Sequence, residues 1–118
     1  MRQFEYFYAS QSEQFVFYRI PKALFTNDRF SGLSYGAKLL YGLMLDRVGL
    51  SRKENWIDKQ GRVYIYFTLD EISEQLHCAK QKAGNLIAEL DKRGIGLIET
   101  KRQGLGKPNI IYVKNFTT

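Results

Sequence analysis

The sequence predicts an α+β domain, mainly helical with a small antiparallel sheet, and three observations lead to this prediction. Two short amphipathic segments of helical spacing follow one another over residues 68–93. An apolar run of strand character precedes them at 63–67, and two further runs, at 96–102 and 109–114, enclose a glycine-rich turn. The order strand, helix, helix, strand, turn, strand is that of a winged helix-turn-helix with a β-hairpin wing.

The composition indicates a folded chain with an uneven positive charge. Its 118 residues suit a single domain over 1–118, and its 44% apolar and 14% aromatic content excludes disorder. The net charge is +6, of which residues 1–79 contribute only +1, from ten Lys/Arg and nine Asp/Glu. Residues 80–118 contribute +5, from eight Lys/Arg and three Asp/Glu. We therefore expect the last third of the chain to attract a polyanion, although a charged surface that faces only water has the same composition.

Three elements are expected near the N-terminus. The run FVFYRI at 15–20 is aromatic and β-branched and stops at a proline, which predicts a short strand. PKALF at 21–25 predicts a single helical turn. Ser34 is the predicted N-cap of a scaffold helix that runs to about Val48. Its buried residues are expected to be Ala37, Leu40, Tyr41, Met44 and Val48.

A polar connection and a strand come next. The connection at 51–61 contains one tryptophan, Trp56, which we expect to fold back onto the core. VYIYF at 63–67 is apolar on both faces. This pattern predicts a strand that helices cover on one side and aromatic side chains contact on the other.

The two tandem helices have clear start and stop signals. Thr68 is the predicted N-cap of the first, and Glu71 follows at the spacing of a capping box. The second helix is expected over 79–93, with Gly94 as its C-cap. The predicted buried residues are Leu69, Ile72 and Leu76 in the first helix and Ala83, Leu86, Ile87 and Leu90 in the second.

The outward positions of the second helix carry side chains suited to DNA bases. In a helix-turn-helix the N-terminal turns of this helix face base edges in the major groove. The positions concerned are Lys80, Gln81, Lys82, Gly84 and Asn85. Lysine can donate to guanine, while glutamine and asparagine can pair with adenine. A glycine inside a helix lowers helix stability by roughly 1 kcal/mol relative to alanine. Gly84 therefore indicates that another molecule or segment approaches the helix closely at this position. A helix that faces only water can carry the same residues.

The turn at 100–113, TKRQGLGKPNIIYV, is the predicted wing. It contains three cations, Lys101, Arg102 and Lys107. Such a turn can contact the phosphate backbone or the adjacent minor groove. Gly104 and Gly106 are expected to adopt positive φ, and Pro108 to stiffen the exit of the turn. The alternative is a solvated hairpin tip whose charges protect edge strands from pairing.

Two further features bear on binding. The N-terminus of the first helix in this motif lies against a phosphate, so Thr68 is a candidate phosphate contact as well as a cap. Seven aromatic residues precede residue 19: Phe4, Tyr6, Phe7, Tyr8, Phe15, Phe17 and Tyr18. They suit a contact between two copies of the chain, a core strand, or stacking on single-stranded bases.

No pattern of catalytic residues is present. Gly106-Lys107 resembles the end of a phosphate-binding loop, but Lys101 stands where that loop requires glycine and Pro108 replaces Ser/Thr. We therefore expect neither an enzyme nor a cofactor.

Metal binding and membrane insertion are not expected either. His77 and Cys78 lack the second pair that would complete a metal site, and we expect both in the turn between the tandem helices, with Cys78 filling the core. With one cysteine, no signal-peptide pattern and no apolar run of about 18 residues, the sequence predicts a soluble cytoplasmic protein without membrane contact.

Four separated segments of the chain form a more specific pattern. They are YRIPKALFTNDRF, AKLLYGLMLDRVGLS, GRVYIYFTLDEI and KRQGLGKPNIIYVKNF, in this order over about residues 15–116. Together they resemble the N-terminal domain of the replication initiator protein A family, which belongs to plasmids and related mobile elements of Gram-positive bacteria.

This resemblance implies a winged-helix domain that binds double-stranded repeats of a replication origin as a dimer. It also implies that 1–118 is the N-terminal part of a longer initiator, whose C-terminal domain, absent here, engages host replication proteins. The family's recognition positions correspond to Lys80, Gln81, Lys82 and Asn85, and its wing contacts to Arg102, Gln103 and Lys107. A winged-helix transcriptional regulator is the alternative, because both functions need the same groove contacts.

Overall fold

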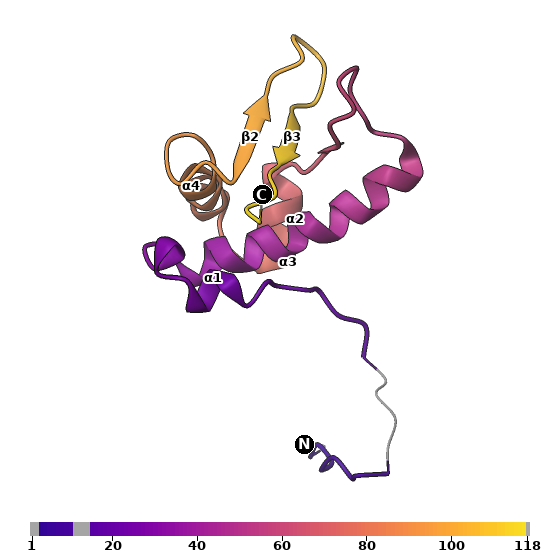
Figure 1. Cartoon of the computed structure of the whole chain (residues 1–118), viewed down its shortest axis with the longest axis vertical. Helices are drawn as coiled ribbons and strands as arrows, with labels where there is room; N and C mark the ends of the chain where they lie inside the picture. Colours follow the sequence, from indigo (N-terminus) through magenta and orange to yellow (C-terminus); the bar gives the residue numbers. More distant parts are fainter. Residues whose placement is uncertain (1–2, 11–14, 118) are drawn as a thin grey trace.

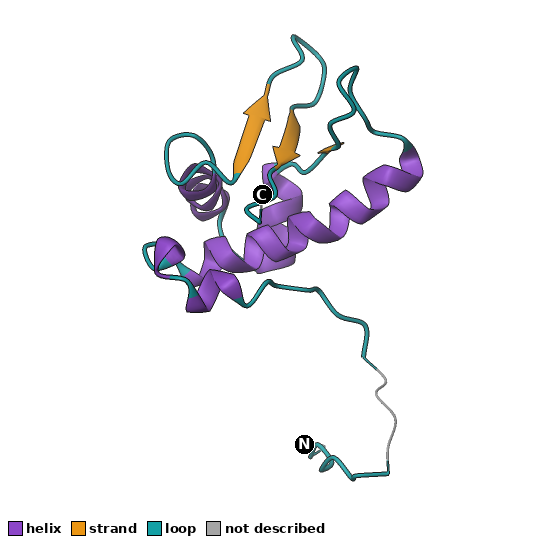
Figure 2. Ribbon diagram, viewed as in Figure 1, coloured by secondary structure: helices purple, strands orange, loops and turns teal. Residues whose placement is uncertain are grey.

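The computed structural model describes residues 3–10 and 15–117 and shows three strands set against a layer of helices (Figures 1 and 2). Strand order in the sheet is β1-β3-β2, with both pairings antiparallel, so the last strand lies in the middle. This is the predicted winged-helix arrangement. In chain order the elements are α1 (Ala23–Thr26), the 3-10 helix η1 (Asp28–Phe30), α2 (Tyr35–Glu54), β1 (Tyr64–Ile65), α3 (Leu69–Leu76), α4 (Lys80–Leu90), β2 (Ile98–Lys101) and β3 (Ile110–Val113).

The scaffold helix α2 begins as predicted but is longer than predicted. The Ser34 hydroxyl accepts the Ala37 N–H at 3.1 Å and donates to the Glu89 carboxylate at 2.7 Å, so one side chain caps α2 and joins it to α4. The helix continues past Val48 to Glu54, and its C-cap, Asn55, adopts the left-handed conformation with φ 59°. The apolar stripe thins after Val48, but backbone hydrogen bonding continues through polar residues, which the stripe could not indicate.

The sheet is narrow and buries one face under the helices. Ile65, Ile98 and Ile111 lie on that face, and each is at most 3% exposed. The strand predicted over 63–67 is shorter, because only Tyr64 and Ile65 pair with β3 and Val63 makes an isolated bridge to Ile57.

Aromatic side chains pack on the other side of the sheet, as predicted. Trp56 contacts Tyr66 edge-on with ring centroids 4.9 Å apart, and Tyr64 contacts Tyr112 at 6.2 Å. Trp56 is only half-buried. It therefore folds back onto this outer aromatic layer, and the expectation that it reaches the core is wrong.

The tandem helices follow the predicted pattern with two corrections. Thr68 and Glu71 form the capping box, and Ile72 is fully buried. Leu69, however, is 45% exposed, because the first turn of α3 lies at the edge of the domain. The buried residues of α4 are those predicted, Ala83, Leu86, Ile87 and Leu90.

The second correction concerns the end of α4. The helix ends at Leu90 with Asp91 as its C-cap, so Gly94 is not the C-cap. The chain instead folds back on the helix, and a Cβ at Gly94 would lie 2.1 Å from the Glu89 carbonyl oxygen. Glycine is therefore required at this position by space, and not by a left-handed cap.

The turn between the two helices is as predicted. His77 adopts the left-handed conformation with φ 53°, and Cys78 packs, partly buried, against the core. A left-handed residue reverses the chain within two residues, so α3 and α4 contact each other directly.

The N-terminal segment is not the predicted strand. Residues 15–19 have no secondary structure and are exposed, and the segment leads away from the domain on the side opposite the β2–β3 turn (Figure 1). It joins the domain at Ile20, whose side chain fills the space above Gly42, where a Cβ would lie 2.6 Å from it. Aromatic and β-branched residues favour a strand only where a neighbouring strand can pair with them, and the described sheet does not extend to this segment.

Arg47 joins α2 to α3 and to the segment between β1 and α3. Its guanidinium lies 3.8 Å from the ring centroid of Phe67, donates from Nη1 to the Tyr66 carbonyl at 2.7 Å and pairs from Nη2 with Glu71 at 3.2 Å. Glu71 in turn accepts the Thr68 N–H at 2.9 Å. Hydrogen bonding to that N–H lowers the pKa of Glu71, burial opposes the change, and the Arg47 charge adds to the lowering. The N-terminus of α3 is thereby fixed to the scaffold helix.

We expect Arg47→Ala to lower the free energy of unfolding by about 2–3 kcal/mol, because it removes a charged hydrogen bond, a cation–π contact and an ion pair together. Urea denaturation followed by circular dichroism measures the change. Lys53→Ala, at an exposed position of the same helix, is the matched control and should change stability by less than about 0.5 kcal/mol. Equal stabilities of the two variants would contradict the role of Arg47.

Candidate nucleic-acid interface

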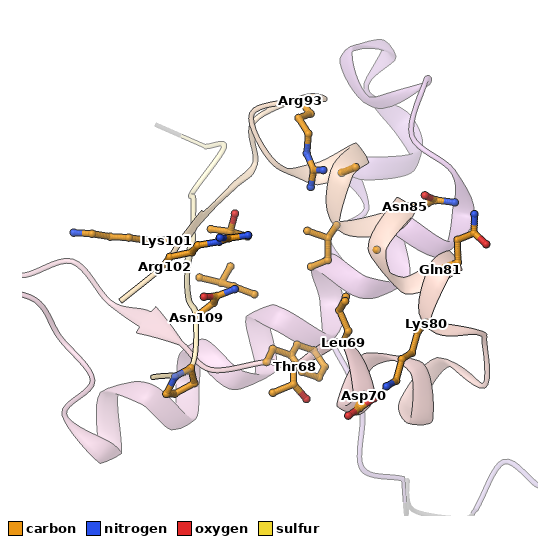
Figure 3. Close-up of a pocket in the computed structure, with 17 residues that line it drawn as sticks. Thr68, Leu69, Asp70, Lys80, Gln81, Asn85, Arg93, Lys101, Arg102 and Asn109 are labelled. Carbon is orange, nitrogen blue, oxygen red and sulfur yellow. Dashed lines mark ion pairs between the residues drawn. The ribbon is translucent and has the colours of Figure 1, made fainter. Parts of the chain in front are cut away.

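A groove of about 850 Å³ lies between α4, the start of α3 and the β2–β3 hairpin (Figure 3). One wall is the outward face of α4, and the other is formed by the hairpin residues nearest the sheet. Figure 3 shows Gln81 and Asn85 on one side of the groove and Lys101, Arg102 and Asn109 on the other. Thr68 lies at one end, and the lining residues, from Phe67 to Ile111, are up to 44 positions apart in the sequence.

The structure brings together six of the nine predicted contact residues. These six line the groove: Thr68, Lys80, Gln81, Asn85, Lys101 and Arg102. The other three, Lys82, Gln103 and Lys107, do not line it. All nine are exposed. Six of the predicted residues therefore belong to one continuous surface, and Lys82, Gln103 and Lys107 lie outside it.

Helical periodicity explains which face of α4 lines the groove. The four buried residues hold one face of the helix against the core, so the residues between them point outward. Gly84 lies on this outward face and lines the groove, and a Cβ built on it would meet no protein atom within 4 Å. Within the part of the chain that the structure describes, no neighbouring segment therefore requires a glycine at position 84.

Lys80 is held by a partner that the sequence did not reveal. Its Nζ lies 2.7 Å from an Asp70 oxygen, and the hydrogen bond to this carboxylate raises the pKa of Lys80 (Figure 3). Both side chains are about two-thirds exposed. Water and salt screen such a pair, so Lys80 can exchange Asp70 for another anion at little cost.

Arg93 is a second groove residue that sequence reasoning missed. It lies just past α4, where its guanidinium makes hydrogen bonds of 2.7–3.2 Å to Asp91, whose side chain is 5% exposed. The hydrogen bond from Arg93 lowers the pKa of Asp91, although burial opposes this shift. A two-point contact to a buried carboxylate fixes the direction of the guanidinium at the groove. The basic pair Lys92-Arg93 after the helix was the only sequence signal for this position.

Asn109 and Thr100 also line the groove, although neither was predicted as a contact residue. Both lie where the hairpin meets the sheet. Their signal in the sequence was weak, because a polar residue in a short strand usually faces only solvent. Their amide and hydroxyl groups add both donors and acceptors to the groove wall.

The wing has the predicted backbone. Gly104 and Gly106 have φ of 122° and 76°, and the Lys107 N–H donates to the Gly104 carbonyl at 3.2 Å. Every residue from 101 to 109 is exposed. The hairpin therefore projects from the sheet as a narrow, solvated loop.

The charge of the groove suits an anion. Four cations line it, Lys80, Arg93, Lys101 and Arg102, against one carboxylate, Asp70. Uncharged amide side chains from Gln81, Asn85 and Asn109 lie among them. Cations for phosphates together with amides for base edges are the groups by which proteins bind DNA.

Within residues 3–10 and 15–117, no group of three or more His, Cys, Asp and Glu side chains is arranged to hold a metal ion. Within the same residues, no helix combines the length and the hydropathy needed to cross a membrane.

A family of known proteins matches nearly the whole chain. The family described as "Replication initiator protein A (RepA) N-terminus" matches residues 16–118. A "41 kDa protein" of Lactobacillus helveticus is 37% identical over 101 residues, which are 86% of this chain and 28% of that protein. The chain thus spans less than a third of the length of this relative.

Solved structures also resemble the chain. A structure described as "Structure of Rep-DNA complex" has a TM-score of 0.75 at 34% identity, covering 94% of this chain and 84% of that one. An "N-Terminal domain of DNA binding protein" has a TM-score of 0.73 at 34% identity, covering 89% and 85%. A third, "Structure of MDR initiator", has a TM-score of 0.71 at 35% identity, covering 85% and 77%.

Proposed function

The chain belongs to the replication initiator protein A (RepA) N-terminus family, and we propose on this premise that it binds double-stranded repeats of a replication origin to initiate replication. The replicon would be a plasmid or a related mobile element. The observation that carries the proposal is the groove, in which the outward face of α4 and a cationic hairpin lie side by side. Similarity to a Rep–DNA complex over 94% of the chain supports it and favours an initiator over a transcriptional regulator.

The helix α4 supplies base recognition in this proposal. An α-helix fits the major groove of B-DNA, and the first turns of α4 carry Gln81 and Asn85 on the exposed side. Amide side chains can bond adenine at two points, and Lys80 can donate to guanine once it leaves Asp70. Specificity therefore resides mainly in the part of the groove nearest the start of α4.

The wing and Arg93 supply contacts to phosphates. Lys101 and Arg102 line the hairpin wall of the groove, and Lys107 lies further along the hairpin, where the sugar–phosphate backbone beside a bound helix would lie. The Thr68 hydroxyl accepts the Glu71 N–H at 3.1 Å, so its part is to hold the first turn of α3 in place beside a phosphate.

A second copy of the chain would complete the binding unit. One winged helix buries roughly 600–1,000 Å² on DNA, which gives little discrimination against a genome of competing sites. The described N-terminal segment offers exposed aromatic side chains, including Phe15 and Phe17, which contact each other at 5.9 Å. We propose that these residues join two copies, so that two α4 helices meet two half-sites.

The proposal places this domain within a larger initiator in the cytoplasm. Residues 1–118 would form its single N-terminal domain, and a further domain would engage host replication proteins. Support comes from the length of the Lactobacillus helveticus relative, of which the matched region is 28%. In this account the domain binds DNA without catalysing a reaction and needs no cofactor.

Affinity for duplex DNA should fall steeply with salt. With about five phosphate contacts per copy, log K should fall with a slope of roughly −4 to −5 against log salt concentration. Fluorescence anisotropy across a salt series measures the slope, and Lys107→Gln should make it shallower by about 0.9. A slope near zero for the unchanged protein would refute the phosphate contacts.

Helix and wing substitutions should differ in their effect on specificity. Asn85→Ala should cost about 1–3 kcal/mol on an origin repeat and less on random DNA, because its amide contacts a base. Arg102→Ala should weaken binding to both DNAs nearly alike. Competition binding gives both values, with Gln75→Ala, exposed on α3 outside the groove, as the control. If Asn85→Ala weakens both DNAs equally, α4 only positions the domain and specificity comes from DNA shape.

Dimer formation should depend on the N-terminal aromatics. The free domain should sediment as a dimer at tens of micromolar, an order of magnitude suited to a stable interface, and Phe15→Ser with Phe17→Ser should make it monomeric. Phe25→Ser, at another exposed aromatic outside this segment, is the control and should leave the dimer intact. A monomeric free domain, or a double variant that still dimerises, would exclude this segment as the contact.

A further inference from the structure

Leu105 stands at the outermost corner of the wing. It is the second residue of the turn 104–107, which the hydrogen bond from the Lys107 N–H to the Gly104 carbonyl closes. The third residue, Gly106, has φ 76°, the conformation that a type II turn requires there. Such a turn directs the side chain at its second position outward, and the Leu105 side chain is 106% exposed, the highest value among the large hydrophobic residues described.

The fold gives no reason for leucine at this corner. Tight turns favour polar residues, glycine or proline, each of which suits the turn or its solvation. A leucine held in water forfeits the stabilisation that its burial would supply. The neighbouring glycines also do not serve packing, because a Cβ at Gly104 or Gly106 would meet no atom within 4 Å. The tip, Gly104 to Gly106, therefore presents one apolar side chain between two residues without side chains. Within the described residues, Leu105 has no packing partner.

The base of the wing is rigid and its sides are charged. Ile98, Ile110 and Ile111 anchor the two strands in the core, each at most 6% exposed. Beyond this anchor the hairpin carries Lys101 and Arg102 on one side and Lys107 on the other. A polyanion that these cations bind would therefore lie against the apolar tip.

Resting on the proposed function, we propose that Leu105 is a wedge that enters the DNA minor groove beside the major groove occupied by α4. The two flanking glycines let the backbone approach the groove floor, and the leucine contacts sugars and base edges and partly unstacks one base step. Apolar side chains inserted in this way bend the duplex toward the major groove. Pyrimidine–purine steps unstack most easily, so the wing would select TA or CA/TG steps at positions that no hydrogen bond reads.

The test combines binding with bending. A duplex containing one origin repeat carries a fluorophore at each end, so that energy transfer reports the bend, and anisotropy reports affinity at low salt. We expect the unchanged protein to bind and to raise energy transfer. Leu105→Ala should lose about tenfold in affinity and most of the bend, since it removes the buried part of the wedge. Leu50→Ala, half-exposed on α2 outside the groove, should behave as the unchanged protein.

A second substitution separates a wedge from a simple backbone contact. Leu105→Lys adds a cation at the tip, so it should keep much of the low-salt affinity while losing the bend. An equal or larger bend with Leu105→Lys would overturn the wedge, as would an unchanged protein that binds without bending or a Leu105→Ala variant that binds and bends normally. In those three cases the proposed function stands. Failure of the unchanged protein to bind the duplex at low salt would instead refute the proposed function itself.

Discussion

The groove depends on how Arg47 fixes the start of α3 to the scaffold helix. One guanidinium stacks on Phe67, bonds the Tyr66 carbonyl and pairs with Glu71, which also caps α3. These contacts set the end of β1 and the first turn of α3 at a fixed distance from α2. The second link is Ser34, whose hydroxyl and N–H both donate to Glu89 of α4. Both helices of the groove are thus oriented by α2, which itself lines no part of it.

The cationic side chains of the groove differ in how firmly the protein holds them. Arg93 is held at two points by a buried carboxylate, so its direction is set before any ligand arrives. Lys80 is paired with the exposed Asp70 and can move at little cost. The groove therefore has a movable cation, Lys80, at the start of α4 and a fixed one, Arg93, just past its end.

Two parts of the chain project from the domain with exposed apolar side chains, and they lead in opposite directions (Figure 1). The wing carries Leu105 between cations, and the N-terminal segment carries aromatics beyond the anchor that Ile20 makes on Gly42. A contiguous exposed apolar patch, such as the aromatic side chains of the N-terminal segment could form, often marks an interaction site. Their placement on opposite sides would let the proposed DNA contact and the proposed contact with a second copy form without competing for one surface.

The sequence by itself determined the order and type of most elements, because hydrophobic spacing and capping are local properties. The capping box at Thr68, the buried face of α4 and the left-handed glycines of the wing are each set within a few residues. Six of the nine predicted contacts therefore line the groove. The tertiary structure decided what depends on distant partners. The aromatic segment at 15–20 lacks a strand to pair with, and position 94 requires glycine because the Glu89 carbonyl leaves no space for a side chain. It also placed Arg93 and Asn109 in the groove and paired Lys80 with Asp70. Local patterns state which side chains face outward, but only the packing of α3, α4 and the hairpin on α2 decides which outward faces meet.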